Sequence, residues 1–225
     1  TGWTGTYEGK DVVIAAGTTG DINLTANWSI NTYTVSYDLA GGTLADGQNN
    51  PTSYNVTESF TLYNPTKVGY DFVGWKGTGI DGTQENVTVA EGTTGDLAFT
   101  AVWTARPDTK YTVNYYLENV NGDQTYTLSA DSFVGEYYSD QSITPAVPVY
   151  TGFATPVAQT KVVNADGTTV FIFYYERNIY TYTFKAIGYE DDVYKYYYEY
   201  PVAKPADPTR KGYTFEGWNP VVYAT

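Results

Sequence analysis

The sequence predicts a mostly β chain of tandem small modules, strung in an elongated array. A repeated motif and short strands of alternating polarity, separated by glycine-rich turns, carry this prediction. Residues 65–75 and 208–218 share the pattern PT-x-x-GY-x-F-x-GW, and GTTGD occurs at residues 17–21 and again at 92–96. Self-similarity at a fixed spacing indicates an array of small units rather than one large domain.

The first strand of each unit alternates strictly between apolar and polar residues. Residues 33–38 (YTVSYD), 111–116 (YTVNYY) and 180–185 (YTYTFK) begin 78 and 69 residues apart. A period of two, with aromatic and β-branched residues on one face, is typical of a half-buried strand. Residues 170–175 (VFIFYY) are apolar at every position, which predicts a central strand buried on both faces.

This spacing divides the chain into four parts. In chain order they are the C-terminal half of a module (1–29), a complete module (30–104), a second complete module (108–177), and the N-terminal half of a module (178–225). The two halves are complementary. An arbitrary cut with frayed ends is the simpler interpretation; the alternative is that the halves of neighbouring chains complete each other, giving head-to-tail self-association into filaments.

Composition excludes several classes of function. Twelve basic against 25 acidic residues give a net charge of −13, which argues against binding of nucleic acid. No apolar run approaches the roughly 18 residues of a spanning helix, so membrane insertion is not expected. Without His or Cys the chain lacks the usual nucleophile–base pairs and metal ligands. We therefore expect no enzyme activity, no cofactor and no metal site.

The motifs resemble a known repeat family. The opener YTVSYDLAGGT at residues 33–43, the GW block at 65–75 and the closing strand that ends at Trp103 resemble the Listeria–Bacteroides repeat, or internalin B-repeat. Residues 108–177 (YTVNYYLEN to TVFIFYYE) are similar to a mucin-binding-protein (MucBP) repeat. The resemblance implies small β-grasp-like modules in the stalk of a secreted, wall-anchored bacterial adhesin. It implies no catalytic residues.

The aromatic residues at repeated positions are predicted to form the module cores, because large rings bury most area in small domains. An alternative for the GW pairs is a sugar-stacking platform. The predicted core residues are Trp3, Trp28, Tyr33, Val35, Tyr37, Tyr70, Phe72, Trp75, Trp103, Tyr111, Val113, Tyr115, Tyr180, Tyr182, Phe184, Tyr213, Phe215 and Trp218.

The densest aromatic stretch, YKYYYEY at residues 194–200, is the candidate ligand site. Alternation places Tyr194, Tyr196 and Tyr198 on one face and Tyr197 on the other, where we expect the most exposed ring. Such a strand can bind mucin or other host glycans by ring stacking, or it can simply cover a thin core.

Overall fold

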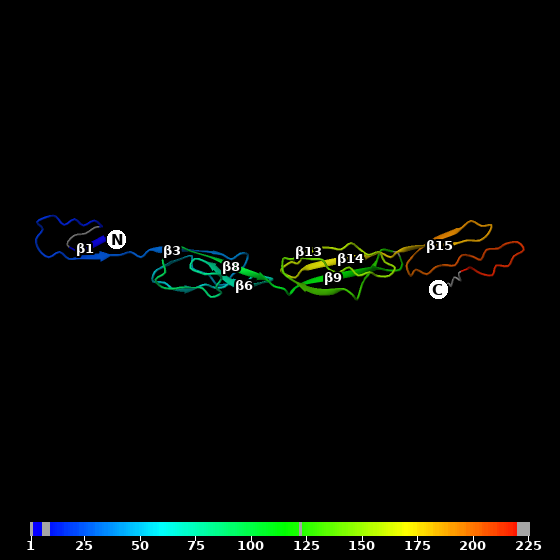
Figure 1. Ribbon diagram of the computed structural model, residues 1–225, viewed down its shortest axis with the longest axis horizontal. Coiled ribbons are helices and arrows are strands. Elements are labelled where there is room, and N and C mark those ends of the chain that lie inside the picture. Colours follow the sequence, from blue (N-terminus) through cyan, green and yellow to red (C-terminus); the bar gives the residue numbers. More distant parts are fainter. Residues whose placement is uncertain (1, 6–9, 122, 220–225) are drawn as a thin grey trace. The chain divides into compact units, whose positions relative to one another are not determined.

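The structure is a computed structural model that describes residues 2–5, 10–121 and 123–219. The chain separates into two compact units, Thr1–Thr104 and Ala105–Thr225. Sixteen short strands form several small sheets, and the described residues contain no helix (Figure 1). The predicted fold class, small β modules, is thereby confirmed. Accordingly, no helix in this part of the chain could cross a membrane.

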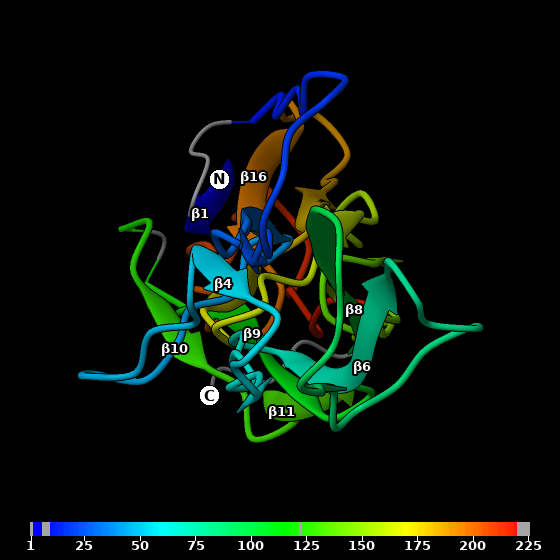
Figure 2. The same cartoon turned by 90° about the vertical axis from the view of Figure 1, so that its left-hand side faces the viewer.

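In the first unit, residues 30–104 form a four-stranded sheet in the order β4-β3-β8-β6. Its strands are β3 (Thr32–Asp38), β4 (Ser53–Asn55), β6 (Tyr70–Gly77) and β8 (Leu97–Ala105). The opening strand β3 lies parallel to the closing strand β8, with Val35 opposite Leu97 and Tyr37 opposite Phe99. Strands β8 and β6 lie side by side (Figures 1 and 2). A small second sheet joins β5 (Phe60–Thr61) to β7 (Thr88–Val89).

The core of this module is built around Trp75, whose side chain is completely buried. Alternation along β3 and β8 turns one face of each strand inward, and Tyr54 and Leu62 complete the layer. Of the predicted core residues in this module, Val35 and Trp75 are buried, and four others pack against the cluster as half-buried rings: Tyr33, Tyr37, Phe72 and Trp103. Tyr70 is half-buried. Burial raises the pKa of Tyr37 to about 12, while its hydroxyl donates to the Pro51 carbonyl at 2.7 Å.

The N-terminal hairpin pairs β1 (Gly2–Gly5) with β2 (Leu24–Asn27) in antiparallel register. The predicted core residue Trp3 lies outside the residues whose side chains are described. Trp28 was predicted to be buried, and this was wrong: its side chain is 89% exposed. In the described residues β2 pairs only with β1, so no second strand covers the indole as β3 covers the closing strand of the complete module.

In the second unit, residues 108–177 repeat the same parallel pairing of opening and closing strands. Strand β9 (Thr109–Glu118) pairs with β14 (Thr169–Tyr175) along one edge. Its other edge pairs with β10 (Tyr126–Leu128) and β11 (Phe133–Tyr137), and a separate pair joins β12 (Ser142–Ile143) to β13 (Lys161–Val162). Predicted core residues Tyr111, Val113 and Tyr115 are buried here.

Strand β14 corrects one expectation from the sequence. It was predicted to be a central strand, but among the described strands it pairs only with β9, and it buries alternate residues. Phe171, Phe173 and Tyr175 point into the core, and burial raises the pKa of Tyr175 to about 12. The intervening Val170, Ile172 and Tyr174 are partly exposed. Strand β14 is thus an edge strand whose outward-facing residues are also apolar, and for this reason its sequence does not alternate between apolar and polar residues.

Residues 178–219 form a hairpin, β15 (Ile179–Phe184) with β16 (Asp192–Tyr197), followed by a chain without long strands. Phe184 is buried, and Phe215 and Trp218 are half-buried. Three other predicted core residues are exposed, which corrects the prediction: Tyr180 (44%), Tyr182 (42%) and Tyr213 (67%). The reason is that β15 pairs only with β16 in the described part of the chain, so its other edge and one of its faces lack a covering strand.

Candidate functional site

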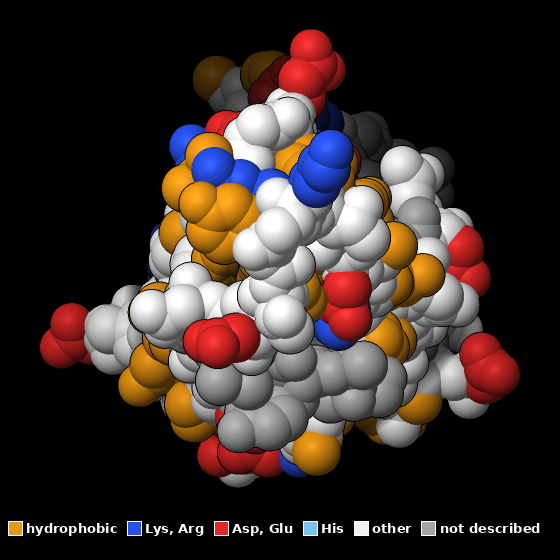
Figure 3. Space-filling view, turned by 90° about the vertical axis from the view of Figure 1, so that its right-hand side faces the viewer, with side chains coloured by type: hydrophobic (Ala, Val, Ile, Leu, Met, Phe, Trp, Pro, Cys, Tyr) orange, Lys and Arg blue, Asp and Glu red, His pale blue; other side chains and the backbone are white. Residues whose placement is uncertain are grey.

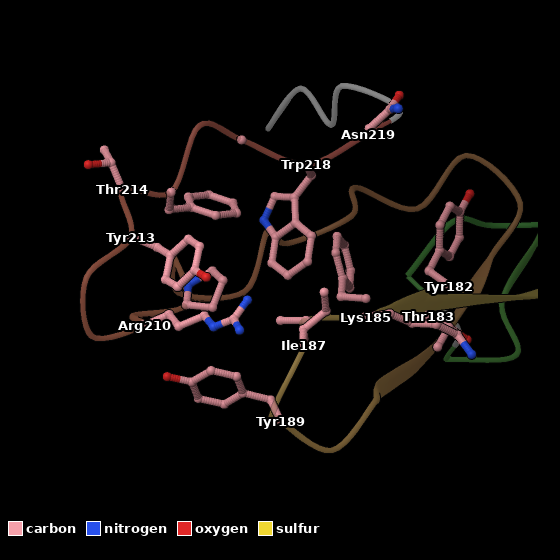
Figure 4. A pocket seen from close by; sticks show the side chains of 15 residues that line it. Tyr182, Thr183, Lys185, Ile187, Tyr189, Arg210, Tyr213, Thr214, Trp218 and Asn219 are labelled. Carbon is pink, nitrogen blue, oxygen red and sulfur yellow. The ribbon is translucent and has the colours of Figure 1, made fainter.

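An open aromatic cleft lies in residues 178–219. Its volume is about 640 Å³, and its lining comes from β15, from the turn that follows it and from the GW motif. Figure 4 shows the Trp218 indole at the centre, with Ile187 opposite it and with Arg210 and Tyr213 along one wall. Ile187 is 80% exposed and Tyr189 is 52% exposed, so the cleft presents apolar surface to its surroundings. We refer to this feature as the aromatic cleft.

The ring geometry around Trp218 is the same as that around Trp75 in the complete module. Phe184 meets Trp218 edge-on at 5.1 Å and Phe215 does so at 5.3 Å. The corresponding rings Tyr37 and Phe72 meet Trp75 edge-on at 6.2 and 5.7 Å. Edge-to-face packing is the favoured arrangement of such rings. Residues 178–219 thus contain a cluster of three rings that corresponds to part of the core of the complete module.

The turn that precedes the GW motif is also reproduced. Arg210 lies over the ring of Tyr213 at 4.1 Å, as Lys67 lies over Tyr70 at 4.1 Å. A hydroxyl–carbonyl hydrogen bond from Tyr189 to Thr209 ties this turn to the opposite wall of the cleft. Figure 3 shows hydrophobic side chains at the surface beside Lys and Arg side chains.

Trp75 and Trp218 differ in whether the indole N–H has a hydrogen-bond acceptor. Trp75 Nε1 donates to Asn64 Oδ1 at 3.0 Å. Trp218 Nε1 is buried and has no hydrogen-bond partner among the described residues. An unpaired buried donor costs roughly 1–3 kcal/mol. Among the described residues, Trp218 thus lacks an acceptor equivalent to the Asn64 side chain at Trp75.

The glycine of the GW motif shows the same contrast. Gly74 has a φ of 140°, and a Cβ there would lie 2.7 Å from the backbone carbon of Gln84. Gly217 has a φ of 123°, and a Cβ there would meet nothing within 4 Å. The glycine of the motif therefore leaves room for a backbone segment that passes close to it in the complete module. No such segment lies near Gly217 in the described structure.

The four predicted ligand-binding tyrosines do not form one surface. Tyr194, Tyr196 and the neighbouring Tyr200 stack in a row, with ring centroids 6.1 and 6.0 Å apart. Tyr194 is 36% exposed and Tyr200 is 42% exposed. Tyr197 is half-buried, so the expectation that it carries the most exposed ring was wrong. The more exposed rings, those of Tyr194 and Tyr200, lie on the face of the strand opposite to Tyr197, because no other described element covers that outer side of the hairpin.

Tyr198 belongs to a different environment, the junction with the preceding module. Its ring packs against Phe153 at 6.2 Å and lies directly on Gly152, where a Cβ would come within 2.1 Å of the ring. Strand β16 ends at Tyr197, so the alternation that placed Tyr198 beside Tyr194 does not continue.

Arg177 holds this junction together, and the sequence analysis missed it. Its backbone N–H donates to Oε2 of buried Glu118, and its Nε donates to the Glu118 carbonyl, both at 2.8 Å. Its Nη1 donates to the Tyr198 carbonyl and to Glu199, also at 2.8 Å. The guanidinium stacks on Phe153 at 4.8 Å. The sequence signal for this contact was Glu118 at the end of an apolar strand, because a buried carboxylate needs a hydrogen-bonding or charged partner.

The described residues contain no group of three or more His, Cys, Asp or Glu side chains that could hold a metal ion. Three consecutive acidic residues follow the turn after β15, at 190–192, and one of them, Asp191, pairs with Lys185 at 2.9 Å. The arrangement offers apolar surface, stacked rings and a free strand edge, which are features of a binding surface.

Comparison with known proteins follows the repeats seen in the structure. A search of curated proteins found no match to this chain. No family match covers the middle module, so the MucBP resemblance of residues 108–177 stays an expectation. Residues 33–102, which form the complete first module, and residues 180–221, which include the aromatic cleft, match the Listeria-Bacteroides repeat domain.

Proposed function

We propose that the chain is a non-catalytic segment of an extracellular bacterial surface protein, in which its modules act as a stalk. The observation that carries the proposal is the pair of Listeria-Bacteroides repeat matches, a domain typical of bacterial surface proteins. The junction at Arg177, which ties one module to the next by side-chain and backbone contacts, supports a mechanical role for at least one of the joints.

The test is accessibility on cells. Antibodies raised against the purified chain should label intact, unpermeabilised cells of the source organism, and brief external protease treatment should remove the signal. An antiserum against a cytoplasmic protein serves as the control for cell integrity. Labelling that requires permeabilisation contradicts the proposal.

A second candidate function is glycan binding, favoured by the row of rings at Tyr194, Tyr196 and Tyr200. Tyr194 and Tyr200 at the two ends of this stacked row are 36% and 42% exposed, and exposed aromatic rings can pack against the apolar faces of sugar units. Tyr194→Ala and Tyr200→Ala should each weaken binding to immobilised mucin at least several-fold. Tyr138→Ala, which removes a 44% exposed ring from the middle module, is the matched control. Equal binding by all three variants contradicts this function.

A further inference from the structure

The outer face of the sheet in the middle module carries a group of three tyrosines. Tyr174 on β14 lies directly opposite Tyr116 on the parallel strand β9, and Tyr126 on β10 completes the group. The Tyr116 and Tyr174 rings stack with their centroids 5.4 Å apart and an interplanar angle of 24°. Tyr126 meets Tyr174 edge-on at 4.9 Å. The buried core of the described module is built from other residues, so these rings form a separate cluster on its surface.

The two stacked rings can be reached from solvent. Tyr174 is 53% exposed, and Tyr116 is partly exposed. Two other close tyrosine pairs in the complete modules each contain a ring that is fully buried, that of Tyr54 or that of Tyr175. A reagent in solution therefore reaches both members of the Tyr116–Tyr174 pair, whereas in these other pairs it is excluded from one ring.

The composition of the chain directs one-electron oxidation toward tyrosine. The sequence has 25 tyrosines and neither cysteine nor methionine, whose sulfur atoms are the side-chain groups most readily oxidised. A phenol that loses one electron and one proton becomes a phenoxyl radical, in which the unpaired electron is shared with the ortho carbons of the ring. Two such radicals that are held in contact combine at these carbons, and fixed proximity favours this reaction over coupling between separate chains.

We propose that Tyr116 and Tyr174 form an oxidative cross-linking site, which a haem peroxidase with hydrogen peroxide converts into a dityrosine between β9 and β14. Each phenol gives up one electron and one proton, and a carbon–carbon bond forms between one ortho carbon of each ring. Each of these carbons then releases its proton while the ring oxygen takes one up, which restores both phenols. Hydrogen peroxide accepts the two electrons and two protons and becomes two molecules of water, so the protein loses two hydrogen atoms.

The ring geometry selects Tyr116 over Tyr126 as the partner of Tyr174. In the stacked pair the two rings lie nearly parallel on adjacent strands, so a small rotation of the side chains brings two ortho carbons together. In the edge-on pair the edge of one ring points at the face of the other, so the ortho carbons of the two rings do not lie side by side. Tyr126 therefore packs against the cluster without taking part in the bond.

Such a bond joins the opening strand of the module to its closing strand. All seven residues of β14 pair with β9, and the two tyrosines lie about 60 positions apart in the sequence. Closing a loop of this length removes conformational entropy from the unfolded chain and so stabilises the folded module. The inference goes beyond the stalk function and does not rest on it, because the reaction needs only the folded module and the oxidant.

The experiment is peroxidase treatment of the purified 225-residue chain at low concentration, followed by proteolytic digestion and tandem mass spectrometry. The main cross-link within one chain should join the peptides that contain Tyr116 and Tyr174, with a mass two hydrogen atoms below their sum and with dityrosine fluorescence. Tyr116→Phe and Tyr174→Phe keep the ring but remove the phenol, and each should abolish this product. Tyr126→Phe is the matched control and should leave the yield unchanged. Far-ultraviolet circular dichroism checks that each variant folds.

Two further measurements separate the folded geometry from the abundance of tyrosine. The chain treated in concentrated urea should give this cross-link at a yield lower by at least about tenfold, because unfolding separates the two strands. After treatment in buffer, the amides of β9 and β14 should exchange at least about tenfold more slowly than in the treated Tyr174→Phe chain. The absence of a cross-link within the chain, a main product that uses Tyr126 or another tyrosine, or equal yields from folded and unfolded chains overturns the proposal. Unchanged exchange overturns the stabilising effect of the bond.

Discussion

Replacing Trp75 by Ala tests whether the GW tryptophan is the centre of the module core. The side chain is fully buried, contacts Tyr37 and Phe72 edge-on, and donates a hydrogen bond to Asn64. Truncating a buried Trp costs about 3–5 kcal/mol, and losing the hydrogen bond adds about 1 kcal/mol. A module of this size has a total stability of roughly 4–11 kcal/mol. The variant should therefore leave the first module largely unfolded or marginal.

The measurement is hydrogen exchange followed by mass spectrometry, which reads residues 33–103 separately from the rest of the chain. Amides of β3 and β8 should exchange faster by a factor of about a thousand in Trp75→Ala, which corresponds to a loss of roughly 4 kcal/mol. The matched control is Trp218→Ala. Its ring is only half-buried and lacks an Nε1 partner in the described structure, so its loss should be about 1–2 kcal/mol. Equal losses at the two sites would refute the reasoning.

Three further predictions concern backbone space, pH and the junction. Gly74→Ala should destabilise its module by about 2–4 kcal/mol in urea unfolding, since strain adds to the backbone clash, and Gly217→Ala by only about 1 kcal/mol. The raised pKa of Tyr37 means that its stabilising contribution is complete below pH 10 and is lost as pH rises toward about 12; Tyr37→Phe should flatten the pH dependence of unfolding in that window. Arg177→Ala should weaken the junction by roughly 2–3 kcal/mol and speed exchange in β15, and Arg177→Lys should not rescue it because an ammonium lacks the planar fork. Unchanged exchange in either Arg177 variant would show that backbone contacts alone hold the joint.

Strand positions were predictable because each opening strand alternates with a period of two. The patterns at residues 33–38, 111–116 and 180–185 correspond to β3, β9 and β15 within a few residues. Parallel pairing of β3 with β8 was not predictable in this way, because it joins residues about 60 positions apart in the sequence. Nothing in the local pattern of either strand records which partner lies beside it.

The burial of individual aromatic rings was less predictable than the strands. Trp28 and Trp103 occupy the same place in the repeat, yet Trp28 is 89% exposed, whereas Trp103 packs against a core. The alternation in the local sequence specifies on which face of the strand a ring lies. Whether that face is covered depends on a neighbouring strand. For the same reason Tyr198 was misplaced, since its environment is set by Gly152 and Phe153 of the preceding module.

The two sides of the segment formed by residues 178–219 differ in how many of their polar groups have partners. On one side the junction at Arg177 satisfies the carbonyl of Tyr198 and the carboxylate of Glu199. On the other side the Trp218 N–H lacks a partner in the described structure and the free edge of β15 presents unpaired N–H groups. The junction therefore supports the hairpin through the end of its second strand, whereas β15 is paired with β16 alone in the described structure.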